Sequence, residues 1–557
     1  MKRPFVFLLI GILTVAVGAL AFRLPRLALR PMHGDEANQA VKAGILLETG
    51  VYHYDPSEHH GPSLSYLSLP SLLSPRTFAE MDEDVLRIVH NLTQPSLWFH
   101  GARIFAETDE EMFRIVPVVF GVGVILLLLL VGDGLGRAAA VVAGVLLAIS
   151  PAMVFYSRYY VQEMLLVFFT LAAIACGWRY VRTKSVAWAA MAGASIGLAH
   201  ATKETWVLAA AAMTAGLVLE ALWTRLRDGP QAPLRKLLRL WAIVGGVVAA
   251  VVVAALLYSS FGANLCGPLD SVLTFSSYLN KAFENKLHDH PWYYYLLMLV
   301  ADRPARGFFW SEGLIVGLAL VGFVVALTRK GLPDEHKPLA RFLAFYTLIL
   351  TVLYSAISYK TPWCMLSFLC GMILLAGVGA VALVRLVPGR PLKAAVCVVL
   401  AAAAMHLGWQ ACQLNFRFYA DQRNPYVYAH TSPDVLNLAA RMEQLAKVAP
   451  EGYNMQVYVI TPENYWPLPW YLRRFNQDHV GFWHDVDLWW GDVKGLPPPA
   501  VVIVSPEVEA AVEERLKGPY NRQSIYGLRP TVLLQVWVRE SLWEKMLSGE
   551  SKGGGAK

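Results

Sequence analysis

Charged residues are scarce in this sequence of 557 residues, since Asp, Glu, Lys and Arg make up only 16% of it, whereas 56% is apolar. The mean hydropathy is +0.43. A soluble core of this size could not bury that much apolar surface, so the composition excludes an ordinary water-soluble protein. We therefore expect a membrane to be the main solvent of the chain.

Cysteine is also sparse, and positive charge gathers in no single patch. The six cysteines form no C-x-x-C pair, which argues against a zinc site or a disulfide framework. Only Cys266 and Cys364 are placed for a disulfide on the outer face. The net charge of +7 comes from Lys and Arg spread over short connectors, so we expect no nucleic acid partner.

Long apolar runs dominate the first three quarters of the chain. A membrane-spanning helix needs about 20 apolar residues. Runs near that length cover residues 4–22, 115–131, 138–153, 161–178, 187–201, 204–222, 240–258, 308–327, 342–358, 362–384 and 393–410. They predict a polytopic α-helical membrane protein with about 11 spanning helices.

The distribution of positive charge predicts the orientation, because Lys and Arg are enriched in cytoplasmic loops. Most of these residues lie at the N-terminus and in every second connector. We therefore expect a multi-pass protein of the inner (plasma) membrane with a cytoplasmic N-terminus. External loops are then expected at 23–114 and 259–307, and the C-terminal part lies outside.

The chain changes character after residue 411, where the expected membrane domain (1–411) ends. Beyond it, strand-length apolar runs alternate with segments of helical periodicity. The runs are 455–460, 500–504 and 531–538, and the helical segments are 434–448 and 506–517. This alternation predicts an extracytoplasmic α/β domain over 412–545. It contains no phosphate-binding glycine loop and no nucleophile elbow, and a Gly-rich tail at 546–557 is expected to be disordered.

Two adjacent acids, Asp35 and Glu36, lie just beyond the first apolar run, where a short helix is expected to begin. The helix dipole stabilises acidic residues in a first turn, which is the simplest explanation of the pair. A carboxylate at the membrane surface can also accept a proton from a hydroxyl or bind a divalent metal. Three histidines follow within residues 53–60, including His59 and His60, and they fit a metal site, a phosphate contact or a solvated loop.

Each of three outer connectors carries a cation against the topological trend. Arg158 and Tyr159 precede Glu163 in one connector, Lys203 lies in the second and Lys360 in the third. Snorkelling to the membrane surface explains any one of these cations. Three cations on one face would together suit an anionic lipid phosphate.

The order of these segments resembles the C-type membrane glycosyltransferases that use polyprenyl-phosphate sugars, such as protein O-mannosyltransferases and the aminoarabinose transferases of lipid A. Asp35-Glu36 is similar to the paired acids of their first external loop, and Glu163 to the acid of their second. The segment 197–204, GLAHATKE, resembles their G-L-A-x-x-T-K motif.

Within that group the chain is most similar to the flippase-activity-associated membrane proteins of the archaeal Agl type. The likeness rests on HPWYYY at 290–295, YKTPW at 359–363 and WPLPWYLR at 466–473. A charged insertion at 74–108 departs from their pattern.

The resemblance implies an inverting transfer of a sugar from polyprenyl phosphate to an extracytoplasmic glycan, lipid or protein. Asp35 would be the general base, Glu36 and Glu163 would support it, and Asp35 and Glu163 could hold Mg²⁺ or Mn²⁺. The donor contacts would be His59, His60, Arg158, Tyr159, Lys203 and Lys360. No nucleotide cofactor is implied.

Two other functions compete with this enzyme hypothesis. The same charges could line a path in a transporter or flippase, or bind the carrier in a non-catalytic accessory protein. Transporter sites lie near the midplane of the membrane, whereas these polar clusters lie at helix ends on one side, which favours an enzyme.

Overall fold

The computed structural model describes residues 3–56, 60–73, 104–227, 239–284, 288–328 and 331–553, and these form two compact units. The first unit comprises 1–27, 51–71 and 111–428. The second comprises 28–50, 72–110 and 429–557, so part of the expected first external loop belongs with the C-terminal part. The domain boundary at 411 and 412 stays a prediction.

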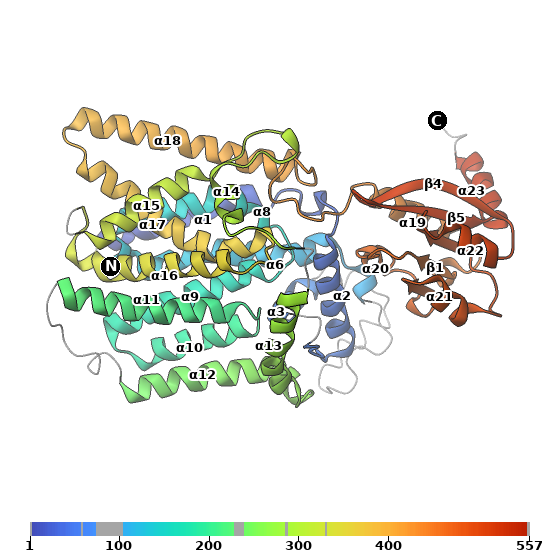
Figure 1. Cartoon of the computed structure of the whole chain (residues 1–557), viewed down its shortest axis with the longest axis horizontal. Coiled ribbons are helices and arrows are strands. Elements are labelled where there is room, and N and C mark those ends of the chain that lie inside the picture. Colours follow the sequence, from blue (N-terminus) through green and yellow to red (C-terminus); the bar gives the residue numbers. More distant parts are fainter. Residues whose placement is uncertain are drawn as a thin grey trace. The chain divides into compact units, whose positions relative to one another are not determined.

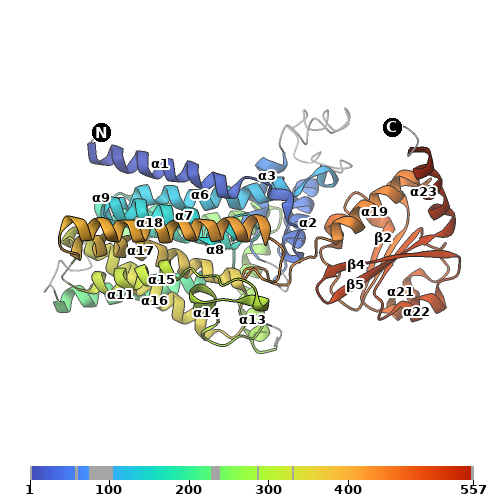
Figure 2. The same cartoon turned by 90° about the horizontal axis from the view of Figure 1, so that it is seen from above.

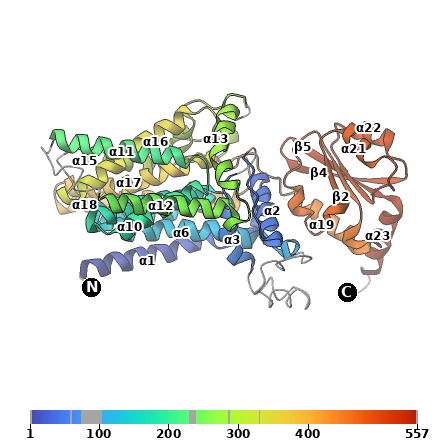
Figure 3. The same ribbon diagram turned by 90° about the horizontal axis from the view of Figure 1, so that it is seen from below.

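The first unit is a bundle of long helices (Figure 1). The long helices are α1 (Arg3–Arg23), α6 (Glu110–Leu135), α7 (Arg137–Ile149), α9 (Glu163–Thr183), α10 (Val186–His200), α11 (Trp206–Arg227), α12 (Leu240–Tyr258), α15 (Gly313–Leu327), α16 (Lys337–Ala356), α17 (Leu366–Leu386) and α18 (Arg390–Cys412). Shorter helices are α3 (Ser63–Leu72), α8 (Pro151–Tyr156), α13 (Gly267–Glu284) and α14 (Tyr294–Val300). Figure 3 shows α3 and α13 at the end of this bundle opposite to the N-terminus.

Helix length and composition confirm a polytopic α-helical membrane protein. In the described residues, 8 helices are long and apolar enough to cross a membrane. Three shorter apolar helices, Arg137–Ile149, Val186–His200 and Gly313–Leu327, fall below the length of about 20 residues that a full span needs. The expected count of eleven spans therefore stays a prediction, although a helix forms at every predicted run.

Small residues allow close helix contacts in the bundle. A Cβ atom at Gly193 in α10 would lie 1.9 Å from the Gly246 carbonyl oxygen in α12. Gly322 in α15 and Gly379 in α17 are similarly placed, because a Cβ at either would lie 2.0 Å from a backbone oxygen of the other helix. Membrane helices associate through such close backbone approaches, since lipid supplies no hydrophobic drive between them. All six cysteines, Cys266 and Cys364 included, are free.

The second unit contains the C-terminal α/β fold that the sequence predicts. Its strands are β1 (Val457–Ile460), β2 (Val480–Trp483), β3 (Val501–Val504), β4 (Tyr520–Arg529) and β5 (Val532–Arg539), in the sheet order β2-β1-β3-β5-β4. β1 is parallel to β2 and β3, whereas β5 is antiparallel to β3 and β4. The helices of the unit are α2 (Gly34–Thr49), α19 (Val435–Val448), α20 (Leu468–Tyr471), α21 (Val486–Val493), α22 (Glu509–Arg515) and α23 (Glu540–Gly553). Figure 2 shows α19 and α23 on one face of the sheet and α21 and α22 on the other.

The C-terminal tail differs from its expectation. α23 runs to Gly553, so most of the segment 546–557 that we expected to be disordered is helical, and its last four residues lie outside the described part. Leu542 and Met546 are buried one helical turn apart, and the Arg441 side chain of α19 contacts the Met546 sulfur at 3.4 Å. Apolar residues at this spacing hold a helix against its neighbour.

Candidate functional site

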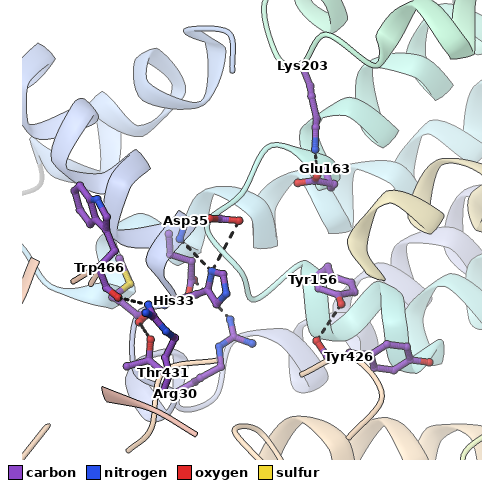
Figure 4. A network of polar contacts seen from close by, with 12 residues as sticks. Arg30, His33, Asp35, Tyr156, Glu163, Lys203, Tyr426, Thr431 and Trp466 are labelled. Atoms are coloured by element: carbon purple, nitrogen blue, oxygen red, sulfur yellow. Dashed lines mark hydrogen bonds and ion pairs between the residues drawn. The ribbon is translucent and has the colours of Figure 1, made fainter. Parts of the chain in front are cut away.

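A buried ion pair joins two of the connectors that are predicted to lie outside. Glu163 is the first residue of α9, and Lys203 lies in the connector between α10 and α11. The Lys203 ammonium contacts the Glu163 carboxylate, with side chains only 7% and 5% exposed (Figure 4). Loss of either partner would leave a buried charge without compensation, so the two residues depend on each other.

A histidine–carboxylate pair lies next to this ion pair along the chain. The His60 Nδ1 atom lies 2.8 Å from Glu204 Oε2, and the Tyr54 hydroxyl donates to Glu204 Oε1 at 3.3 Å. Glu204 is 4% exposed and His60 is 27% exposed. Burial by itself would raise the pKa of Glu204, but the charge and hydrogen bond of His60, aided by Lys203, hold it below its usual value. Glu204 therefore orients the imidazole as a carboxylate.

Close backbone contact brings the His60 loop to this connector. The Ser63 amide donates to the Ala201 carbonyl at 2.9 Å, and the Ser63 and Thr202 hydroxyls lie 2.7 Å apart. A Cβ atom at Gly61 would lie 2.2 Å from the Ala201 carbonyl oxygen. Only glycine fits this approach, which explains the Gly-Pro sequence after His60.

Arg158 and Tyr159 have structural roles within the bundle. The Arg158 guanidinium donates to the carbonyls of Arg23 and Pro25 at 2.8 Å, at the C-terminal end of α1. Arg23 in turn donates to the Leu147 carbonyl of α7 at 2.8 Å. A cation at the C-terminus of a helix satisfies carbonyls that have no partner within the helix. The Tyr159 ring is buried, so neither residue needs a phosphate to explain its place.

Lys360 binds a different part of the chain from Lys203. Its ammonium donates to the carbonyls of His290, at 3.0 Å, and Ile357. Its backbone amide donates to the His288 carbonyl at 2.9 Å, so the YKTPW segment pairs with the HPWYYY segment. Burial lowers the pKa of Lys360, while Asp289 opposes that change. Arg158, Lys203 and Lys360 therefore have three separate sets of partners.

In the second unit, the paired acids begin helix α2 and have unequal environments. The His33 ring caps the helix by accepting from the Asp35 amide at 3.0 Å, and the Glu36 carboxylate accepts from the His33 amide at 3.1 Å. This is a capping box. Glu36 is fully buried with Arg30 3.6 Å away, whereas the Asp35 side chain is 56% exposed. Asp35 is therefore the acid that a solvent-borne acceptor can reach.

Side chains from the C-terminal segment form hydrogen bonds with the residues that precede α2. The Thr431 hydroxyl donates to the Met32 carbonyl at 2.7 Å, and the Met32 amide donates to the Tyr471 hydroxyl at 2.9 Å. The His33 and His430 rings lie 5.3 Å apart. Tyr471 belongs to the WPLPWYLR segment, so this segment positions the N-terminus of the helix that carries Asp35.

Comparison with known proteins finds a family model that matches part of the chain and solved structures of similar fold. Residues 93–266 match the family model of the dolichyl-phosphate-mannose-protein mannosyltransferases. The ArnT structure from Cupriavidus metallidurans bound to undecaprenyl phosphate is 16% identical, with 95% of this chain and 98% of that chain covered at a TM-score of 0.63. The archaeal oligosaccharyltransferase AglB from Archaeoglobus fulgidus, in complex with an inhibitory peptide and a dolichol-phosphate, is 12% identical, with 98% and 77% covered at 0.54.

This chain has the fold of the C-type membrane glycosyltransferases. The resemblance seen in the sequence is confirmed at that level, and the matched segment contains Arg158, Glu163 and Lys203. No protein of curated function matches the chain by sequence.

In this glycosyltransferase fold, the predicted site residues fall into separate groups. The structure pairs Glu163 with Lys203 and His60 with Glu204, whereas Asp35 and Glu36 belong to the other unit. His59 and most of the insertion at 74–108 lie outside the described residues. The sequence analysis assigned no role to Tyr54 or to Glu204, the last residue of the GLAHATKE segment, although the charge of Glu204 beside Lys203 could have suggested one.

The described residues do not fit a bound divalent metal. Among them, no three His, Cys, Asp or Glu side chains gather in a way that could hold a metal ion. Glu163 already neutralises Lys203. Metal binding by Asp35 and Glu163, which belong to different units, stays a prediction.

Proposed function

We propose that this chain is a glycosyltransferase that moves a sugar from a polyprenyl-phosphate carrier to an extracytoplasmic acceptor. The observation that carries the proposal is the concentration of charge at the connector between α10 and α11. There, Lys203 and Glu204 are adjacent, buried and paired with residues of two other connectors, Glu163 and His60. Buried charges at the end of membrane helices are costly and mark functional sites.

The fold and its neighbours support the choice of donor. ArnT was crystallised with undecaprenyl phosphate and AglB with a dolichol-phosphate, and both share the fold of this chain. The family that residues 93–266 match is also named after a dolichyl-phosphate-linked sugar, dolichyl-phosphate mannose. A phosphate carried on a lipid arrives at the membrane surface, where the ends of the bundle helices lie.

The proposed reaction is a direct displacement at the anomeric carbon. The acceptor hydroxyl oxygen forms a bond to that carbon while the bond to the phosphate oxygen breaks, and the polyprenyl phosphate leaves with its electron pair. A base must take the hydroxyl proton, and cations must stabilise the departing phosphate. We assign the base to Asp35 and the phosphate contacts to Lys203 and His60.

The environments of the paired acids support Asp35 over Glu36 as the base. Glu36 already accepts from the His33 amide and lies buried beside Arg30. Asp35 keeps an exposed carboxylate at the start of a capped helix. The proposal places this chemistry on the extracytoplasmic side of the inner membrane, with the N-terminus in the cytoplasm.

The test is a donor-cleavage assay with the purified full chain. The protein is incubated with a panel of polyprenyl-phosphate sugars and mixed glycan, lipid and peptide acceptors, and mass spectrometry follows the appearance of free polyprenyl phosphate. We expect release from at least one donor, and a fall of about 100-fold when Lys203 and Glu163 are replaced together by Met and Gln, since both charges of the pair are removed. Arg390→Gln is the matched control, because this exposed cation lies at the start of α18 and has no assigned role.

The same preparation separates the enzyme from its two competitors. A flippase in vesicles would move the intact lipid-linked sugar across the membrane without cleaving it. An accessory protein would retain the lipid without cleaving or moving it. Binding of the donor with no cleavage of any sugar, in the presence of mixed glycan, lipid and peptide acceptors, would overturn the proposal.

A further inference from the structure

A cleft of about 410 Å³ opens at the other end of the helix bundle. It is lined by the α6–α7 turn, the last turns of α9 and α17, and the segment that leads into α16. Arg182, which lines the cleft, is 19 residues after Glu163 in the same helix, so the two lie about 29 Å apart along its axis at 1.5 Å per residue. The cleft is therefore separate from the site proposed above.

Cations of three helices converge on this cleft. Arg137, Arg182 and Arg385 line it, together with the acids Asp133 and Glu335. Asp133 pairs with Arg179, 2.9 Å from its carboxylate, and with Arg182 at 3.8 Å, so the acid and Arg182 largely offset each other. Within the described chain, Arg137 and Arg385 form no ion pair, and both side chains are exposed. The cleft thus keeps positive charge that protein groups do not cancel.

Backbone groups add to the attraction for an anion. α7 begins at Arg137, and in the described residues no side chain caps it after Gly136, which has a φ of 90°. Ala138 and Ala139, in the first turn, line the cleft. Amide groups in a first helical turn have no partner within the helix and carry the positive end of its dipole.

We propose that this cleft binds a phosphate group, with the headgroup of an anionic phospholipid as its natural source. The size of the cleft suits a small polar group rather than a whole lipid. Basic pockets between helix ends bind anionic lipid headgroups in membrane proteins. Simple retention of positive charge in cytoplasmic loops would explain scattered arginines, but it does not require three of them around one hollow with an uncapped helix start.

The test measures lipid retention by native mass spectrometry of the purified full chain in a neutral detergent. Phosphatidylglycerol, phosphatidylcholine and inorganic phosphate are added in separate arms. The variant Arg137→Gln with Arg385→Gln should weaken phosphatidylglycerol binding about 25-fold, since each cation contributes roughly fivefold. The matched control replaces Arg225 and Arg227, exposed arginines at the end of α11 that do not line the cleft, and should bind as the parent does.

A second variant guards against a loss of folding. Ala138→Glu puts a carboxylate in the first turn of α7, where the dipole stabilises it, so the helix should be kept while the anion is repelled. Weaker phosphatidylglycerol binding in both cleft variants supports the lipid source. If both cleft variants bind inorganic phosphate more weakly but bind lipid as the parent does, the natural ligand is a soluble phosphate compound instead. If the cleft variants bind every probe as the parent does, the proposal is overturned.

Discussion

At the scale of single residues, the two adjacent acids differ in their availability for catalysis: Asp35 is exposed, whereas Glu36 is buried. Glu36 completes the capping box of α2, whereas Asp35 is exposed and contributes only its backbone amide to the cap. A structural role for the pair as a whole, through the helix dipole, would not require this difference. The division of labour is the reason for testing the two acids separately.

Replacing Asp35 by Asn should leave the protein folded and inserted but reduce sugar transfer by about 100-fold or more, the usual scale for losing a general base. Asn keeps the shape of the side chain, and its backbone amide can still donate to the His33 ring. Glu36→Gln should instead lower stability by about 3–5 kcal/mol, because it removes the charge beside the buried Arg30 and weakens the cap, with a milder effect on transfer. The measurements are the donor-cleavage rate and the melting temperature. Full activity in Asp35→Asn would move the base to His60 or Glu163.

The lowered pKa of Glu204 predicts how its contribution to stability depends on pH. A carboxyl group whose pKa is lower in the folded state stabilises that state fully above its unfolded pKa of about 4.3, and the effect disappears as the pH falls through the folded value. Glu204→Gln should therefore melt below the parent at about pH 7. The gap should narrow as the pH is lowered below the unfolded pKa. A gap of equal size above and below that pKa would show that His60 does not act through the charge of Glu204.

At the scale of elements, the sheet of the second unit depends on its central strand. β3 lies between β1 and β5, and all four of its side chains are buried. Val502 and Val504 belong to one buried cluster with Trp489 of α21 and Val512 of α22, and none of the four residues faces solvent. β5 differs, because exposed and buried side chains alternate in its first half.

Ile503→Ala should therefore destabilise this sheet by about 2–5 kcal/mol, the usual cost of removing a large buried aliphatic side chain. Leu533→Ala in β5 is the matched control, since that side chain is 46% exposed and its loss should cost less than about 0.5 kcal/mol. Hydrogen exchange of peptides from 455–539 measures both effects. Equal protection in the two variants would contradict the central position of β3.

At the scale of the whole molecule, the proposed function requires a particular orientation in the membrane. The predicted outside charges include the Lys203 and Lys360 connectors, and the predicted inside connectors include the one that leads into α16. Asp334 in that connector and Asp487 in the C-terminal fold are 94% and 81% exposed, so a probe at either position can react.

In a cysteine-free background, an impermeant maleimide should label Asp487→Cys in intact cells. Asp334→Cys should react only after the membrane is permeabilised, because inside connectors are shielded from the reagent. The extent of labelling is read by the mass shift of the purified chain. Labelling of position 334 in intact cells would reverse the orientation and place the Lys203 connector in the cytoplasm.

The sequence alone determined the membrane helices and most of the C-terminal fold. Spans are visible in composition because a backbone in lipid must satisfy its polar groups within a helix, so every span needs a long apolar run. The two strands that the sequence did not reveal, β2 and β4, are the edges of the sheet. Edge strands are partly exposed and carry polar residues, as in YNRQSIYGLR of β4, which weakens the apolar signal.

Only the tertiary structure decided which charges act together. Lys203 pairs with Glu163, 40 residues away in the sequence, and Glu204 pairs with His60, 144 residues away. Arg158 instead donates to carbonyls at the end of α1. The sequence placed these residues at the same kind of helix end but could not choose their partners. A charge in a low-dielectric setting takes the partner that helix packing brings within a few ångströms, and that distance is a property of the assembled bundle rather than of any local segment.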